Sequence, residues 1–245
     1  MRASLYCEPE RYGPGLSLQR IAQEDTIADG VPRLLMMQHH PVYTIGTQVQ
    51  EEDLAAIPLL DNGIEVCFVN RGGRGSYFAL GMMLAYPIRI IQGARQIALH
   101  QMVQHLKSLE KSVTVLLGQY GIAAEPSGNV RHPGVWVVSN GERKKIAAVG
   151  VGFEKQSADR GYITQHGVVL YLNERPNLDG VLLCGEEGKN LVTVKELLGK
   201  EVPMPEAMES FAEIYATTIG SEAEITFIGT PQVPAPTLEQ LAATA

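Results

Sequence analysis

The chain has 245 residues and a mass of 26.6 kDa, a length that suits one sizeable domain with its own hydrophobic core. Hydrophobic residues make up 45% and charged residues 19%, which is near the globular average and excludes a chain that is disordered throughout. The formal net charge is −7, from 20 Lys and Arg against 27 Asp and Glu, which argues against a general nucleic-acid-binding protein or one that binds anionic membranes.

The first third of the chain predicts one helix and two strands. Apolar spacing favours a helix over 18–29 with Ser17 as its N-cap, followed by a buried strand over 33–38 that ends at His39. A further strand is expected over 65–70, directly before a glycine-rich loop at 71–75.

The middle of the chain predicts a strand, a long helix and a hairpin. We expect a strand over 83–91 and an amphipathic helix from Gln96 that ends at Gly121. Asn140-Gly141 is a pair favoured in tight turns, so 135–139 and 143–153 are predicted to form a β-hairpin.

The last third predicts a strand, two helices and a tail. The strand is expected over 167–172 and the helices over 194–198 and 205–218. We predict a single domain over 1–220 and a loosely ordered C-terminal extension over 221–245, which holds three prolines. Interleaved strands and helices indicate an α/β (α+β) fold with a mixed, largely antiparallel central sheet and covering helices.

Location and cysteine usage point to the cytoplasm. No apolar run approaches the roughly 18 residues that span a bilayer, and charge returns early after Met1, so neither a membrane anchor nor a signal peptide is expected. Cys7, Cys67 and Cys184 are widely spaced, which fits neither a disulfide framework nor a zinc site. No metal is predicted.

Three glycine-containing segments are candidates for close approach to a ligand: Arg71-Gly72-Gly73, Lys145 to Gly150, and Leu183-Cys184-Gly185. None fits a Walker or dinucleotide pattern. Taken alone, the first also reads as a turn with a solvated arginine, and Lys145 as a solvated turn flank.

Cys184 lies in a polar loop, whereas Cys67 lies in an apolar strand. A thiol in such a loop becomes reactive if a base or a cation lies nearby, and Lys145 is a candidate for that group. The alternative is a buried, inert thiol. Among the histidines, His39 and His166 are the better site candidates, while His100 and His105 are expected on the surface or the rim.

The order of several segments resembles the lipoyl(octanoyl) transferases, relatives of the biotin and lipoate protein ligases. The resemblance rests on Gln38 to Gly46, Asn70 to Gly73 with Leu84 to Ile88, Pro133 to Val137, Lys145 to Gly150, His166-Gly167 and Cys184-Gly185. It implies a biotin/lipoate ligase-like fold and a catalytic pair of Cys184 and Lys145.

The resemblance also implies a reaction. An octanoyl group would pass from acyl carrier protein to Cys184 as a thioester and then to a lysine of a lipoyl domain, with Lys145 as general base and without cofactor. The acceptor would be a lipoyl domain of a 2-oxo acid dehydrogenase or the glycine cleavage H protein. The implied substrate-binding residues are His39, Arg71, Gly72, Gly73, Ser76, Tyr77, Phe78, Ala147, Ala148, Val149, Gly150, His166, Gly167 and Gly185. Backbone N–H groups near Gly185 or in the Gly72-Gly73 loop are candidates for the oxyanion site.

The sequence departs from the family pattern near the expected acyl site. Phe78 stands at the family's histidine, Gln38 at its usual glutamate and Leu183 at its usual proline. A changed acyl chain length or acceptor, or a lost activity, would each follow from more apolar surroundings.

Two other functions remain open from the sequence. One is an ATP-dependent lipoate or biotin ligase, although such an enzyme needs no thiol and its longer nucleotide-binding motif is not evident. The other is a non-catalytic protein of the same fold that binds carrier or lipoyl domains. Such acidic partners would need a local basic surface, for which the candidates are Arg71, Arg74, Arg131 and Arg143 to Lys145.

Overall fold

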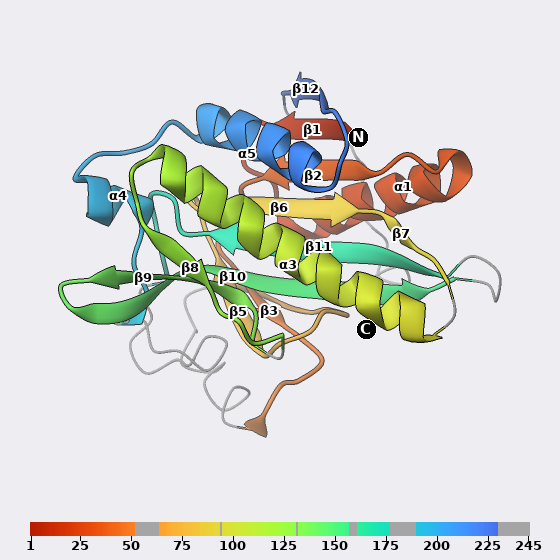
Figure 1. Ribbon diagram of the computed structural model, residues 1–245, viewed down its shortest axis with the longest axis horizontal. Coiled ribbons are helices and arrows are strands. Elements are labelled where there is room, and N and C mark those ends of the chain that lie inside the picture. Colours follow the sequence, from red (N-terminus) through yellow and green to blue (C-terminus); the bar gives the residue numbers. More distant parts are fainter. Residues whose placement is uncertain (52–63, 94, 131, 157–160, 177–189, 230–245) are drawn as a thin grey trace.

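A large twisted sheet forms the centre of the protein (Figure 1). The computed structural model describes residues 1–51, 64–93, 95–130, 132–156, 161–176 and 190–229. Within these residues the sheet has nine strands in the order β12-β1-β2-β6-β11-β10-β9-β8, with β7 paired to β11. Only β1 runs parallel to its neighbours, and the other pairs are antiparallel. The prediction of a mixed, largely antiparallel sheet is confirmed. The strands are β1 Arg2–Tyr6, β2 Arg33–Met37, β6 Met83–Ile88, β7 Ile90–Ile91, β8 Ala124–Pro126, β9 Gly134–Ser139, β10 Glu142–Lys155, β11 Tyr162–Leu170 and β12 Glu224–Ile228.

Helices cover both faces of this sheet (Figure 1). The long α3 (Arg95–Gln119) and α5 (Met204–Thr218) lie on one face, and α1 (Tyr12–Asp29) lies on the other. Each face has its own hydrophobic core. Leu34 and Met36 of β2 point to the α3 side, while Leu35 and Met37 point to the α1 side. Burial on both faces explains why β2 and β6 are nearly continuous apolar runs.

A second, smaller sheet lies beside the first. Its strands are β4 (Glu65–Phe68), β3 (Val42–Ile45) and β5 (Gly75–Phe78), with β3 in the centre. The connection from β4 to β5 contains the Arg71-Gly72-Gly73 loop. The small sheet therefore carries this loop to the central strands, where the site is formed.

Most predicted elements are confirmed. The hairpin of β9 and β10 turns at Asn140 and Gly141, both with positive φ, 53° and 78°, as a tight turn of this kind requires. The long helix ends before Gly121, which has a φ of 74°. The short α4 (Val194–Leu198) begins with a capping box formed by Thr193 and Glu196.

Two predictions about element ends are wrong. The first helix begins at Tyr12 instead of Leu18, and no side chain caps it, so Ser17 is an interior residue. Pro14 lies in the first turn, where its missing N–H costs no helical hydrogen bond. The expected loose extension from residue 221 instead begins with β12, which pairs with β1. Residues 230–245 lie outside the described part of the chain.

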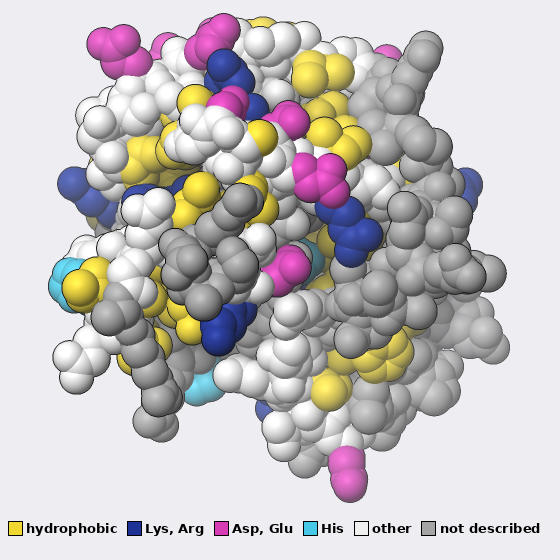
Figure 2. Space-filling view, turned by 90° about the vertical axis from the view of Figure 1, so that its right-hand side faces the viewer, with side chains coloured by type: hydrophobic (Ala, Val, Ile, Leu, Met, Phe, Trp, Pro, Cys, Tyr) yellow, Lys and Arg dark blue, Asp and Glu magenta, His cyan; other side chains and the backbone are white. Residues whose placement is uncertain are grey.

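The surface mixes charges of both signs. Figure 2 shows the end of the molecule at which α1, β7 and the start of α3 lie, and acidic, basic and hydrophobic side chains are interspersed there. No helix of the described residues is long and apolar enough to cross a membrane.

Candidate active site

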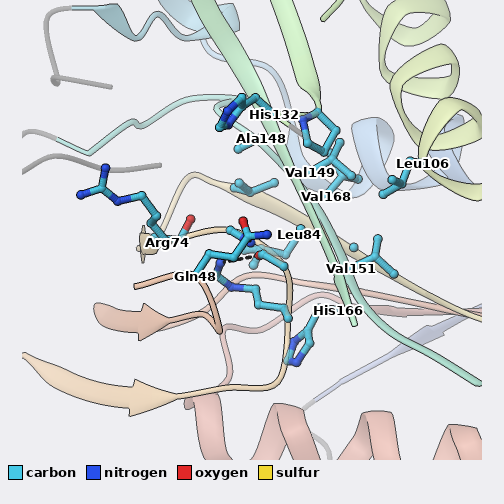
Figure 3. A pocket seen from close by; sticks show the side chains of 18 of the residues that line it. Gln48, Arg74, Leu84, Leu106, His132, Ala148, Val149, Val151, His166 and Val168 are labelled. Atoms are coloured by element: carbon cyan, nitrogen blue, oxygen red, sulfur yellow. Dashed lines mark hydrogen bonds between the residues drawn. The ribbon is translucent and has the colours of Figure 1, made fainter. Parts of the chain in front are cut away.

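A cavity of about 750 Å³ opens where β9 separates from β10. β9 pairs with β10 only as far as Ala148, and beyond that residue β10 continues with β11 as its strand neighbour on one side. Val149, Gly150 and Val151, which follow on β10 beyond the last pair with β9, line the cavity. Figure 3 shows Gln48 and Arg74 on one side of it, Leu106 of α3 on the other, and His166 near α1.

Lys145 lines this cavity from β10. Its exposed fraction is 4%, and its Nζ lies 5.4 Å from the centre of the Trp136 ring. A β-bulge between Lys145 and Ala147 interrupts the pairing with β9. The bulge turns Ile146 and Ala147 to the core on the α3 side, while Lys145 and Ala148 face the cavity. Lys145 is therefore a buried amine and not a solvated turn flank.

Gly134 provides the space for the Lys145 side chain. A Cβ at this position would lie 2.9 Å from Lys145 Cε and 2.7 Å from the carbonyl oxygen of Ala147. Distances this short are not tolerated between real atoms, so only glycine fits. This contact explains the glycine of the Pro133 to Val137 segment.

The chain that follows Cys184 runs beside Lys145. Leu191 forms a parallel bridge with Lys145, and the Val192 N–H donates to the Lys145 carbonyl oxygen at 3.1 Å. Cys184 and Gly185 themselves lie outside the described residues. Cys184 is seven positions before Leu191 in the sequence.

The Arg71-Gly72-Gly73 loop packs on the free edge of β10. The Gly72 N–H donates to the Val151 carbonyl oxygen at 3.1 Å. A Cβ at Gly150 would lie 3.3 Å from the Gly72 carbonyl oxygen, and one at Gly152 would overlap the Asn70 carbonyl oxygen. The glycines of β10 thus let the loop approach the strand backbone closely.

The backbone N–H groups of Gly72 and Gly73 both donate hydrogen bonds in the structure. Gly72 uses its N–H on Val151, and the Gly73 N–H donates to Gln48 Oε1 at 3.2 Å. The two glycine N–H groups are therefore already used in this structure and are not free to hold an oxyanion, whereas the buried Arg71 Nε has no hydrogen-bond partner among the described residues.

Arg71 braces the loop from inside. Its exposed fraction is 5%. Nη2 donates to the carbonyl oxygen of Thr44 at 2.9 Å and to its hydroxyl at 2.8 Å, and Nη1 donates to the Gly72 carbonyl oxygen at 3.1 Å. Arg71, which could have been a solvated turn residue, is thus buried and connects β3 to the loop by hydrogen bonds. Because it is buried, Arg71 is no longer a candidate for the docking surface.

Aromatic and imidazole side chains gather at one end of the cavity. Phe78 lies 6.0 Å from Tyr12 and 6.3 Å from His39, centre to centre. Tyr86 lies 2.8 Å from His39 Nε2, and the Tyr12 hydroxyl lies 3.5 Å from His166 Nδ1. The apolar Phe78 ring therefore packs among hydrogen-bonding groups.

Burial keeps these groups neutral. Desolvation lowers the pKa of His39 to about 4. Desolvation, with a smaller contribution from the nearby Arg71 charge, lowers the pKa of His166 to about 3. Desolvation also raises the pKa of the Tyr12 and Tyr86 hydroxyls. The charge of Arg71 is thus the main ionic feature at this end of the cavity.

His166 has an unusual backbone. Its φ is 58°, a left-handed value that costs energy for a residue with a side chain. Gln19 of α1 holds it, since Gln19 Oε1 accepts the His166 N–H at 2.8 Å. The next residue must be glycine, because a Cβ at Gly167 would overlap the Ala85 carbonyl oxygen.

The remaining wall is mainly apolar, which suits a hydrocarbon chain. Leu84, Val168 and Val169 contribute from the sheet, and Leu106 from α3. No group of three or more His, Cys, Asp or Glu side chains that could hold a metal occurs in the part of the chain that the structure describes.

Most of the predicted site residues meet at this cavity. Those that line it are Arg71, Gly72, Gly73, Ser76, Phe78, Lys145, Ala148, Val149, Gly150, His166 and Gly167. Three predicted binding residues do not line it: His39 lies behind Tyr86, Tyr77 lies against Tyr43, and Ala147 faces the opposite core.

One histidine prediction is wrong and one is confirmed. His105 is 1% exposed because it shares the inner face of α3 with Leu109 and Ser112, at helical spacings of four and seven residues. His100 is exposed, as predicted. The spacing of His105 from these buried residues, instead of from His100, was the informative signal.

Sequence reasoning missed several lining residues. The helix predicted over 18–29 begins after Tyr12, and no motif in the sequence marks Leu106 or His132. The full set that was missed is Tyr12, Gln48, Gln50, Arg74, Leu84, Tyr86, Leu106, Val130, His132, Pro133, Val151, Phe153, Val168 and Val169. Leu106 could have been found from its place on the apolar stripe of the predicted long helix.

Relatives of this chain are octanoyltransferases by name. An octanoyltransferase of Myxococcus xanthus is 31% identical over 86% of this chain, which spans 57% of that relative's length. A mitochondrial octanoyl-[acyl-carrier-protein]:protein N-octanoyltransferase of Danio rerio is 30% identical over 82% of this chain and 85% of the relative.

Solved structures share the fold. A putative lipoate protein ligase from T. acidophilum with bound lipoic acid has a TM-score of 0.67 at 18% identity and covers 94% of this chain and 90% of that one. Lipoate-protein ligase A bound with ATP has a TM-score of 0.64 at 19% identity and covers 93% and 90%. At these identities the likeness concerns the fold.

The family match covers most of the described chain and every residue that lines the cavity. Residues 12–216 match the lipoyl protein ligase A/B catalytic domain, a span that includes Tyr12 of α1, the Arg71 loop, Lys145 and α5. The chain therefore belongs to the lipoyl protein ligase A/B catalytic-domain family, on the side of that family whose relatives are named octanoyltransferases.

Proposed function

We propose that this protein transfers an octanoyl group from acyl carrier protein to a lysine of a lipoyl domain, through a thioester on Cys184 with Lys145 as general base. The observation that carries the proposal is a buried amine, Lys145, on the wall of a largely apolar cavity. The names of the relatives support the octanoyl group and both protein substrates.

The first half-reaction needs a thiolate. The neutral Lys145 amine takes the proton of the Cys184 thiol, and the thiolate attacks the acyl carbonyl of the donor thioester. The bond from the carbonyl carbon to the carrier's sulfur breaks, and the carrier thiolate takes the proton back from Lys145. One thioester replaces another, so the step is nearly isoenergetic and uses no ATP.

The second half-reaction uses the same two groups. The acceptor lysine attacks the Cys184 thioester as a neutral amine and gives a proton to Lys145 as the amide forms. The Cys184 thiolate leaves and then recovers that proton. The amide is more stable than the thioester, which makes this step the thermodynamic drive of the cycle.

The position of Lys145 supports this pairing. The bridge from Lys145 to Leu191 holds the chain seven residues beyond Cys184 against the strand that carries the amine. Seven residues of chain reach at most about 25 Å, so connectivity permits the thiol to reach the amine. A cytoplasmic location remains a prediction from the sequence.

The docking face for the acidic protein substrates is narrower than the sequence suggested. Arg71 is buried, and Lys144 forms a 3.5 Å ion pair with Glu142. Arg143 is exposed and stacks over Trp136 at 4.4 Å. Arg74 lines the cavity. Arg74 and Arg143 are therefore the described candidates, and Arg131 lies outside the described residues.

Intact-mass measurement after incubation with octanoyl-acyl carrier protein tests the proposal. The wild type should gain one octanoyl group that hydroxylamine removes, and a Cys184→Ala variant should gain none. Equal labelling of both proteins, or no label on either, would overturn the mechanism. Formation of an acyl-adenylate from octanoate and ATP would instead identify a ligase, and binding of a lipoyl domain without turnover would identify a non-catalytic protein.

A further inference from the structure

Glu110 is a buried carboxylate that the reaction described above does not use. It lies on α3 with an exposed fraction of 6%. Among the described residues no Lys, Arg or His forms an ion pair with it. A buried carboxylate without a countercharge is costly unless N–H and O–H donors compensate it. Its significance therefore lies in the groups that donate to it.

Those groups form the base of a loop at the cavity. Glu110 Oε1 accepts from the Gly134 N–H at 2.8 Å, from the Ser127 hydroxyl at 2.9 Å and from the Ser127 N–H at 3.4 Å. The Ser127 N–H also donates to the Gly134 carbonyl oxygen at 2.9 Å. One carboxylate oxygen thus joins both ends of the segment from Ser127 to Gly134 and fixes them to α3.

The same segment shapes the cavity. Val130, His132 and Pro133 line the cavity between the two fixed ends, and Figure 3 shows His132 beside Ala148. Leu106, one helical turn before Glu110 on α3, lines it as well. A carboxylate at this place couples the position of the loop to the position of the helix wall.

Gly134 connects this coupling to Lys145. The space in which a Gly134 Cβ would lie is only 2.9 Å from Lys145 Cε, so the stem of the lysine packs directly on the Gly134 backbone. Any shift of Gly134 changes the surface against which the amine is held. Glu110 fixes that surface through a charge-assisted hydrogen bond, a class of bond stronger than a neutral one.

We propose that Glu110 is a positioning residue that holds the Lys145 amine in place through the Gly134 backbone. The proposal rests on the function proposed above, because it assigns a purpose to the placement of Lys145. Glu110 itself touches neither substrate nor the reacting atoms. Glu110 contributes by holding Lys145, the proposed general base, in its position, and small displacements of a catalytic group lower turnover strongly.

Two substitutions separate the acceptor from the side-chain volume. Glu110→Leu removes the acceptor and keeps a similar size, and Glu110→Gln keeps an acceptor oxygen. Ser112→Ala is the matched control, since Ser112 is another buried polar residue of α3 and its hydroxyl donates to the Ser108 carbonyl oxygen at 2.8 Å, away from the loop that Glu110 holds. Steady-state rates are measured with octanoyl-acyl carrier protein and a lipoyl domain on the folded fraction of each variant.

We expect Glu110→Leu to lower kcat by on the order of 100-fold with the KM for the acyl donor unchanged. Glu110→Gln should recover most of the rate, and Ser112→Ala should match the wild type. A folded Glu110→Leu protein with wild-type kcat, a loss confined to KM, or a Glu110→Gln variant as slow as Glu110→Leu overturns the proposal. If Glu110→Leu fails to fold, Ser127→Ala decides, since it removes one donor to the same oxygen and should give a smaller loss in kcat alone.

A second readout separates this proposal from the proposed function. The labelling rate of the Lys145 amine by a small acylating reagent, followed by peptide mass spectrometry, requires no turnover. It should change in Glu110→Leu and stay constant in Ser112→Ala even if the wild type forms no octanoyl adduct. An unchanged labelling rate in Glu110→Leu contradicts the positioning role, whatever the enzyme's activity.

Discussion

Tyr86 donates a hydrogen bond to His39 Nε2 at 2.8 Å, while His39 Nδ1 lies 3.0 Å from the Glu10 carbonyl oxygen. A carbonyl oxygen can only accept, so Nδ1 carries the imidazole proton and Nε2 accepts from the phenol. Both ring nitrogens are thereby satisfied in the neutral form. A second proton on Nε2 would remove the acceptor for the Tyr86 hydroxyl, which would have to accept from Nε2 instead, and would place a charge in the core.

Three buried histidines predict a loss of stability in acid. Desolvation lowers the pKa of His39 to about 4 and those of His105 and His166 to about 3, from an unfolded value of 6.5. Below pH 6.5 these three histidines become protonated in the unfolded chain but stay neutral in the folded protein. The free energy of unfolding therefore falls as the pH falls towards the pKa values of the folded protein. Chemical denaturation at pH 7.5 and pH 4.5 should show a loss of about 2–3 kcal/mol for each histidine.

His105 allows this explanation to be checked at one position. Neither of its ring nitrogens has a hydrogen-bond partner among the described residues. His105→Leu should be at least as stable as the wild type at pH 7.5, since it removes two unpaired nitrogens, and should lose part of the acid sensitivity. The exposed His100→Leu is the control, and an equal pH dependence in both variants would contradict the explanation.

Lys145→Arg should lower the rate of acyl transfer by about 100- to 10,000-fold, because a guanidinium remains protonated and cannot act as a base. Lys144→Arg is the matched control, since Lys144 is the neighbouring lysine on the same strand and pairs with Glu142. Single-turnover formation of the octanoyl adduct is the measurement. Comparable rates in the two variants would exclude Lys145 as the general base.

Gly152→Ala should destabilise the protein by about 1–3 kcal/mol, because the added methyl overlaps the Asn70 carbonyl oxygen and moves the loop that follows. Gly118→Ala in α3 meets nothing within 4 Å and should be stabilising by about 0.5–1 kcal/mol. Urea unfolding compares the two variants. Similar stability changes would show that the close approach of the Asn70 to Gly73 loop is not required.

Phe78→Ala should widen the cavity and move the acyl preference to chains longer than octanoyl, since each additional buried methylene contributes about 0.8 kcal/mol. The variant should also lose about 3–5 kcal/mol of stability. Phe68→Ala is the control, because Phe68 is 58% exposed and does not line the cavity. Competition between octanoyl and dodecanoyl donors measures the preference, and an unchanged ratio would place the acyl chain away from Phe78.

Local patterns in the sequence were sufficient for many elements of the fold. Asn140-Gly141 specified the hairpin by its own backbone preferences, and the apolar stripe of α3 extends over seven turns of helix. The missed strands β1, β3, β5, β8 and β12 are five residues long or shorter. β12 exists because β1 offers it an edge more than two hundred positions away, and no local pattern records such a partner.

Part of the site could be predicted from the sequence, because positions where a side chain would collide with a neighbouring backbone are occupied by glycine. Gly150 lies in a segment that its glycine marks as a candidate for close approach, and a Cβ there would lie 3.3 Å from the Gly72 carbonyl oxygen; Gly167, which the family resemblance indicates, is more crowded still. Tyr12 and Glu110 could not be predicted in this way, because their residue types are ordinary on helices. Only tertiary packing brings Tyr12 to the cavity and Glu110 to the N–H groups of Ser127 and Gly134. For Arg71 the residue type is misleading. A charged residue beside two glycines is usually solvated, but Arg71 is buried and hydrogen-bonded to Thr44 and to the Gly72 carbonyl oxygen.

The bulge at Ile146 sets the phase of the whole strand. In a regular strand Lys145 and Ala148, three positions apart, would lie on opposite faces. Because the bulge adds Ile146 to the strand, both side chains instead face the cavity. Shortening the strand by one residue at this point would restore the regular pleat and rotate the amine towards α3 while Gly150 and Gly152 kept their place. The number of residues between this lysine and the glycines that follow it therefore matters for the proposed general base as much as the choice of lysine does.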